Sequence, residues 1–133
     1  MNKDFIDKLE EIGCPYLENA PLGEYSSIKI GGTCKIATWP ETTDQIKRLI
    51  SLAKEYDIPH YILGNCTNIL VPDSGVHGLV ILLGKSGTNF HNITLVDDTT
   101  IYAEAGVSLR ELCNFALKHG LSGLEFAFGI PAS

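Results

Sequence analysis

The stretch LGNCTNILV, residues 63–71, lies between two apolar segments and combines a glycine, two amides, a hydroxyl and a thiol. Three interpretations fit these residue types: a cysteine active site, a phosphate cradle or a plain polar turn. A catalytic cysteine needs a lowered thiol pKa and usually a histidine partner. His60 is the nearest histidine before Cys66, and no nucleophile signature surrounds that cysteine. The first interpretation is therefore the weakest.

The other two interpretations depend on the backbone of Gly64–Asn68. Successive backbone N–H groups in a turn after a buried strand form an anion-binding concavity, to which Thr67 and Asn68 would add side-chain donors. Neither the Gly-Lys-Ser/Thr ending of a P-loop nor the GxGxxG dinucleotide fingerprint is present. Glycine and asparagine are also common in turns. The residues alone leave the cradle open, with the plain turn as the default.

The composition of the 133-residue chain, 44% hydrophobic and 20% charged, fits one soluble domain or two small lobes. A formal net charge of −6 argues against a nucleic-acid partner, because such binding depends on clustered Lys and Arg. No apolar run approaches the length of a membrane span, so we expect no membrane partner. The acidic, amphipathic start MNKDFIDKLEEIG is neither a signal peptide nor a transit peptide.

The four cysteines and four histidines are widely spaced. No CxxC pair occurs, which predicts neither a disulfide framework nor a zinc site and fits a reducing, cytoplasmic location. No histidine is at metal-ligand spacing from another, so no metal site is predicted.

Apolar periodicity predicts the elements of the first half of the chain. An amphipathic helix over residues 5–12 ends at Gly13, and a second helix runs from a Thr42–Gln45 capping box to about Tyr56. Residues 14–27 are expected to form an irregular loop. The other predicted elements are two short β-type runs on either side of Gly31-Gly32, strands over 60–63 and 69–71, a turn over 72–75, and a buried strand over 79–83.

The second half begins with the polar, glycine-rich segment GKSGTNFHN, residues 84–92, which is the best candidate for a lobe boundary. Segments 93–96 and 100–105 alternate around two aspartates and predict a hairpin. Ser108 and Glu111 form a capping box for a helix that ends near His119-Gly120, with Cys113 on its apolar face as a core residue. This order of elements predicts a two-lobed α+β or α/β fold with lobes 1–83 and 84–133.

Four motifs carry a resemblance to a known family: NAPLGEYSSIKIGG (19–32), LGNCTNILV (63–71), AEAGVSLRELCNFALKHGLSGLEF (103–126) and GIPAS (129–133). Together they resemble the N-terminal part of the UDP-N-acetylenolpyruvoylglucosamine reductase family. The resemblance implies an α+β FAD-binding domain of the vanillyl-alcohol-oxidase type, with the flavin between two small lobes and the second lobe truncated.

The resemblance also implies the cofactor site. One segment would wrap the FAD pyrophosphate from the first lobe, and a second segment would do so from the other lobe. The implied FAD-binding residues are Leu63, Gly64, Asn65, Cys66, Thr67, Asn68 and Ile69 in the first segment, and Gly129, Ile130, Pro131, Ala132 and Ser133 in the second. On this interpretation Cys66 belongs to a phosphate cradle and is not a nucleophile.

The activity implied for the intact enzyme is the reduction of UDP-N-acetylglucosamine enolpyruvate to UDP-N-acetylmuramate with NADPH, a step of bacterial peptidoglycan synthesis. In the family, the catalytic residues follow the turn that matches GIPAS. The resemblance therefore assigns no catalytic residue and no metal ligand to this chain, and implies that the chain alone is inactive and binds the UDP-sugar substrate only as part of an intact enzyme.

Two residues depart from the family pattern, which usually has glycine at the positions of Cys66 and Ala132. A Cβ in a left-handed conformation costs roughly 1–2 kcal/mol, and a side chain there would also approach the ligand. These departures leave an alternative from another class: a non-catalytic remnant that no longer binds flavin.

Overall fold

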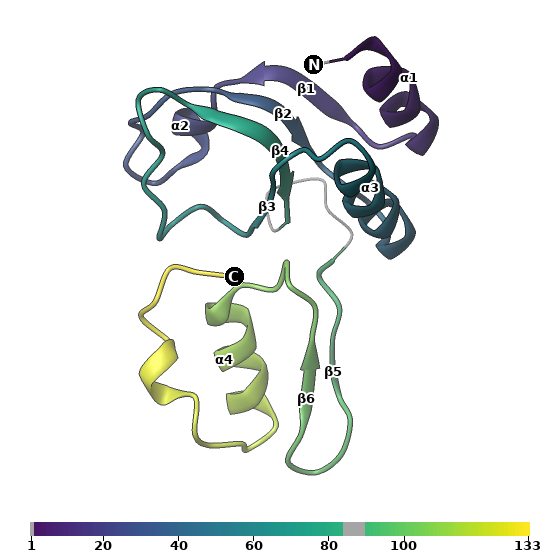
Figure 1. The fold of residues 1–133 in the computed structure, drawn as a ribbon. Coiled ribbons are helices and arrows are strands. Elements are labelled where there is room, and N and C mark those ends of the chain that lie inside the picture. Colours follow the sequence, from purple (N-terminus) through teal and green to yellow (C-terminus); the bar gives the residue numbers. More distant parts are fainter. Residues whose placement is uncertain (1, 84–89) are drawn as a thin grey trace.

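The computed structural model describes residues 2–83 and 90–133. Figure 1 shows a sheet with helices formed by residues 2–83, here called the first region, and a hairpin with a helix formed by residues 90–133, the second region. The first region contains α1 (Lys3–Ile12), β1 (Tyr16–Ala20), α2 (Leu22–Tyr25), β2 (Cys34–Thr38), α3 (Thr43–Glu55), β3 (His60–Leu63) and β4 (Val76–Leu82). The second contains β5 (Ile93–Leu95), β6 (Ile101–Ala103), α4 (Leu109–Lys118) and the 3₁₀ turn η1 (Glu125–Ala127).

The first region is built on a four-stranded sheet of order β1-β2-β4-β3. β1 pairs antiparallel with β2, whereas β4 pairs parallel with both β2 and β3. The central strand β4 is a continuous apolar run that is fully buried from Gly78 to Leu82. Because successive side chains of a strand point to opposite faces, β4 supplies both faces of the sheet with buried apolar side chains.

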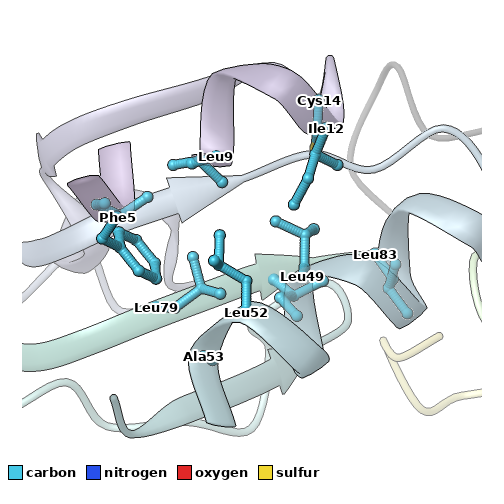
Figure 2. Packing of buried hydrophobic residues seen from close by; sticks show 11 residues of the cluster. Phe5, Leu9, Ile12, Cys14, Leu49, Leu52, Ala53, Leu79 and Leu83 are labelled. Carbon is cyan, nitrogen blue, oxygen red and sulfur yellow. The ribbon is translucent and has the colours of Figure 1, made fainter. Parts of the chain in front are cut away.

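One face of the sheet is covered by α1 and α3. Phe5 and Leu9 of α1 and Leu49 of α3 pack with Leu79 and Ile81 of β4, and all five are fully buried. Figure 2 shows most of this cluster between the two helices and the sheet. Both helices carry apolar residues at helical spacing, so their packed faces follow directly from the sequence pattern.

The opposite face of the sheet is covered by α2 and by the loop that follows β3. Val80 and Leu82 of β4 pack there with Leu22, Cys66 and Val71. The loop is also fixed by backbone contacts, because the Gly32 N–H donates to the Pro72 carbonyl at 3.0 Å. A Cβ at Gly31 would lie only 2.4 Å from the Val71 carbonyl oxygen. The glycine pair in the KIGG motif therefore lets two loops approach backbone to backbone.

The second region pairs β5 with β6 in an antiparallel hairpin and places α4 beside it (Figure 1). α4 begins at a complete capping box: the Ser108 hydroxyl accepts from the Glu111 N–H, and the Glu111 carboxylate accepts from the Ser108 N–H. After α4 ends at Lys118, the chain passes through η1 to the C-terminal segment, which returns towards the first region.

Most predicted elements are confirmed, namely the helices at 5–12 and 43–55, the strands at 60–63 and 79–83, the 72–75 turn, the 93–105 hairpin and the capped helix from Leu109. The predicted boundary at 84–92 falls mostly on residues 84–89, which lie outside the described residues. The division into lobes 1–83 and 84–133 stays a prediction.

Four expectations were wrong. Residues 14–27 are not an irregular loop, because they contain β1 and α2. Residues 28–30 do not form a strand, because they lie between the tight Ser26–Lys29 turn and Gly31. Residues 69–71 do not form a strand either; they lie over the face of the sheet instead of joining its edge. The Thr42 box is incomplete, since the Gln45 side chain accepts from the Glu41 N–H and not from that of Thr42.

Within the described residues, no helix has both the length and the apolar character needed to cross a membrane.

Candidate functional site

The two segments singled out in the sequence, 63–69 and 129–133, meet in the structure. The backbone N–H of Asn65 donates to the Ser133 hydroxyl at 3.2 Å, across 68 residues of sequence. The same C-terminal segment is held by α4, because the Leu109 N–H donates to the Ala132 carbonyl at 2.8 Å. The strand β3 and the start of α4 therefore position the two sides of one site.

A pocket of about 350 Å³ lies between these segments. Its lining residues come from the loop after β3, from the start of α4 and from the turn after η1: Asn65, Thr67, Ser108, Arg110, Phe128, Gly129, Ile130, Pro131 and Ala132. Six of the twelve residues implied by the resemblance are among them. Four of those six come from the turn after η1, so this turn forms most of one wall.

The other six predicted residues lie around the pocket or behind it. Gly64 and Ser133 lie beside it in close contact: a Cβ on Gly64 would be 2.7 Å from the Ser133 hydroxyl oxygen. Leu63 and Ile69 pack against the apolar cluster under the loop, and Asn68 is exposed. That any of the twelve binds FAD stays a prediction.

Cys66 has the left-handed backbone that its family position led us to consider, with φ of 56°. Its side chain is 3% exposed and packs in the apolar cluster behind the loop, with its thiol sulfur 3.4 Å from the Gly64 carbonyl oxygen. Cys66 is not one of the residues that line the pocket. The side chain that replaces the usual glycine therefore adds backbone strain but takes no space from the pocket.

Backbone donors are available on both sides of the pocket. Among the residues that the structure describes, the N–H groups of Thr67 and Gly129 have no acceptor. Thr67 also brings a hydroxyl to the lining. Unpaired backbone N–H groups around a concavity are suited to an anionic oxygen ligand.

Three lining residues were missed by the sequence analysis: Ser108, Arg110 and Phe128. The Glu111 carboxylate accepts from the Ser108 hydroxyl at 2.6 Å and from the Ser108 N–H at 2.9 Å, and these bonds lower the pKa of Glu111. The Arg110 guanidinium lies over the Phe128 ring, 6.0 Å from its centroid. The sequence signal for Arg110 was a single basic residue just after a serine cap, which carries no spatial information by itself.

The remaining reactive groups give no second site. Burial raises the pKa of the Cys14 and Cys34 thiols to about 11, so both are protonated and unreactive at neutral pH. Cys113 is buried on α4, with its sulfur 3.3 Å from the Leu124 carbonyl oxygen, as expected for a core residue. No group of three or more metal-ligand side chains occurs in the parts of the chain that the structure describes.

Comparison with known proteins identifies the class of protein. Residues 34–133 match the family described as FAD binding domain, which covers most of the chain. This chain belongs to the FAD-binding domain family, whose cofactor is FAD.

Within that family, the relatives found are UDP-N-acetylenolpyruvoylglucosamine reductases. The one from Syntrophomonas wolfei is 46% identical over 115 residues, which are 86% of this chain and 37% of the relative. The one from Caldanaerobacter subterraneus is 41% identical over 136 residues, covering 100% of this chain and 43% of the relative. This chain therefore spans about two fifths of the length of the relatives it matches.

Solved structures give the same result for the fold. The UDP-N-acetylenolpyruvylglucosamine reductase of Thermus caldophilus superposes with a TM-score of 0.64 at 32% identity, covering 90% of this chain and 38% of that one. A 4-ethylphenol oxidase from Gulosibacter chungangensis superposes with a TM-score of 0.65 at 19% identity, over 88% of this chain and 24% of that one. The second likeness shows the shared fold alone, an α+β FAD-binding fold of the vanillyl-alcohol-oxidase type.

Proposed function

We propose that this chain is the FAD-binding part of a UDP-N-acetylenolpyruvoylglucosamine reductase and that the pocket between loop 64–68 and turn 129–133 holds the FAD pyrophosphate. The observation that carries this proposal is the meeting of loop 64–68 with turn 129–133, joined by the bond from Asn65 to Ser133. Two segments that the resemblance assigns to one ligand, far apart in sequence, form opposite walls of one pocket.

The pocket residues fit a pyrophosphate. Donors are present on both walls, as the N–H groups of Thr67 and Gly129 and the hydroxyl of Thr67, and Arg110 supplies a positive charge. Backbone N–H groups of a turn can converge on phosphate oxygens without any side chain between them. The departure at Cys66 does not obstruct this, because its side chain packs behind the loop.

The remaining steps of the proposed function belong to an intact enzyme. FAD supplies hydride transfer when bound, and the enzyme would reduce UDP-N-acetylglucosamine enolpyruvate to UDP-N-acetylmuramate with NADPH in the cytoplasm. The residues of this chain would bind and orient the cofactor and exclude water from its phosphates, and none of them would act as a catalytic acid or base. We expect this chain alone to show no NADPH-dependent turnover of that substrate.

The test is a fluorescence titration of the purified chain with FAD, with riboflavin as the phosphate-free comparison. We expect saturable FAD binding and weaker riboflavin binding. Thr67→Val keeps the shape of the side chain and removes one pocket donor, so FAD affinity should fall roughly two- to tenfold. Thr94→Val is the matched control, because Thr94 is exposed on β5, away from the lining residues.

The outcomes separate this proposal from the alternative of a non-catalytic remnant. A folded chain with no detectable FAD binding would contradict the proposal and favour the remnant. FAD binding that Thr67→Val and Thr94→Val weaken equally would place the ligand somewhere other than this pocket.

A further inference from the structure

We infer that Arg110 pairs with the diphosphate of the bound nucleotide and supplies the charge on which its affinity depends. This inference rests on the proposed function and assigns a role to a residue outside the two segments of the predicted cradle. It would make α4 a ligand-binding element as well as a support for the turn after η1.

The first argument is charge. Arg110 is the one charged side chain among the described residues that line the pocket. The chain as a whole carries a formal net charge of −6, so its mean field repels an anion. A diphosphate that enters this pocket is therefore repelled by the chain as a whole. A local positive charge offsets this repulsion; without that charge, only the backbone N–H dipoles could do so.

The second argument is that the Arg110 guanidinium has no competing partner among residues 2–83 and 90–133. In the described part of the chain, it forms no ion pair and donates no hydrogen bond to a protein acceptor. The neighbouring carboxylate of Glu111 is engaged with the N–H and hydroxyl of Ser108 instead. All the guanidinium donors of Arg110 remain available for a ligand.

The third argument is position. α4 begins beside the pocket, and the bond from the Leu109 N–H to the Ala132 carbonyl fixes the first turn of the helix against the wall formed by turn 129–133. The Phe128 ring, which also lines the pocket, lies under the guanidinium. A cation held over an aromatic face keeps its edge free for hydrogen bonds. A planar guanidinium can then bind two phosphate oxygens at once, which an ammonium group does less well.

The experiment compares FAD binding by the parent chain, Arg110→Gln, Arg110→Lys and Arg48→Gln. Arg48 is the matched control, because it is the only other arginine of the chain and lies on α3, where its guanidinium donates to the Glu11 carbonyl. Circular dichroism and the urea midpoint check that each variant is folded. Each titration is repeated at low and high ionic strength.

We expect Arg110→Gln to weaken FAD binding about tenfold or more, the range of a charge-assisted hydrogen bond. Arg110→Lys should fall between it and the parent, and Arg48→Gln should stay within about twofold of the parent, since a distant exposed charge is screened. The affinity of the parent should fall with ionic strength more steeply than that of Arg110→Gln.

Three results would overturn the inference while leaving FAD binding intact. These are equal affinity of Arg110→Gln and the parent, equal losses in Arg110→Gln and Arg48→Gln, or the same dependence on ionic strength in the parent and Arg110→Gln. Failure of the parent chain itself to bind FAD would instead overturn the proposed function, and the role of Arg110 with it.

Discussion

The two regions of the molecule differ in how much apolar surface they bury. Both clusters of buried apolar side chains found in the described residues draw their fully buried members from residues 5–83. The second region buries only Val107, Cys113, Ala116 and Ala127 among its apolar residues, while Leu117 and Phe126 are 75% and 77% exposed. A region that buries so few apolar side chains gains little hydrophobic stabilisation to offset the conformational entropy lost on folding.

Because of this difference, one wall of the pocket is backed by a buried apolar cluster and the other is not. The loop after β3 has Cys66 and Val71 packed behind it in a buried cluster. The turn after η1 is largely exposed on both sides and is held mainly by a few backbone bonds. We conclude that the first region supplies the stability of the chain and that the second region supplies a weakly supported half of the site.

The largest effect is expected from the same substitution, Phe→Ala, made once in each region. Phe5→Ala empties a fully buried position under α1 and should lower the free energy of unfolding by about 3–5 kcal/mol. Phe126→Ala removes a ring that is 77% exposed and should change it by less than about 0.5 kcal/mol. Urea unfolding followed by circular dichroism measures both. A large loss in Phe126→Ala would show that the second region has a core of its own.

A second pair compares glycines with positive φ. Gly75 (φ 78°) lies in the first region, and an added Cβ would be 2.3 Å from the Thr33 carbonyl oxygen, whereas Gly120 (φ 69°) has nothing within 4 Å of that position. Gly120→Ala should cost about 1 kcal/mol of conformational strain, and Gly75→Ala about 2–4 kcal/mol because steric overlap adds to the strain. Urea midpoints of the two variants decide this, and equal midpoints would contradict it.

The smallest effect concerns the capping of α4 and α3. The hydroxyl and N–H of Ser108 lower the pKa of Glu111 in the folded chain. A lowered folded pKa gives stability that is present above the ordinary pKa of glutamate and is lost as pH falls through the folded pKa. Glu111→Gln should therefore cost about 0.5 kcal/mol at neutral pH, discounted for the exposure of the side chain, and nothing at low pH.

The matched change in the first region is Gln45→Ala. The Gln45 side chain accepts from the Glu41 N–H at 2.7 Å at the start of α3 and does not titrate. Its cost should stay constant across the same pH series of urea unfolding curves. A Glu111→Gln difference that is also constant with pH would show that the bonds to Ser108 do not contribute to stability.

The three long helices α1, α3 and α4 were predictable from sequence because their signals are local, whereas the four-residue α2 was missed. The stripe of apolar residues and the caps at Thr42 and Ser108 lie within a few residues of the turns that they determine. The buried strand β4 was predictable for the same reason, as a continuous apolar run.

The errors occurred where long-range pairing decides the structure. β1 was missed because its segment is rich in proline and turn-forming residues, and only pairing with β2 makes it a strand. Residues 69–71 look like a strand but have no ladder partner among the described residues; Val71 is buried against the face of the sheet, whereas Leu70 is 76% exposed. Arg110 and Phe128 reach the pocket only through the return of the C-terminal segment, which no sequence spacing reveals.

The bond between Asn65 and Ser133 has a consequence for the order in which the site forms. It closes a loop of 68 residues, and closing a flexible loop of that length costs roughly 3–4 kcal/mol of chain entropy. A neutral hydrogen bond contributes only about 1 kcal/mol, so the two walls come together late in folding and separate first in local unfolding. Amide hydrogen exchange at Asn65 should therefore be fast in the free chain, and a ligand that bridges both walls should slow it in proportion to its occupancy.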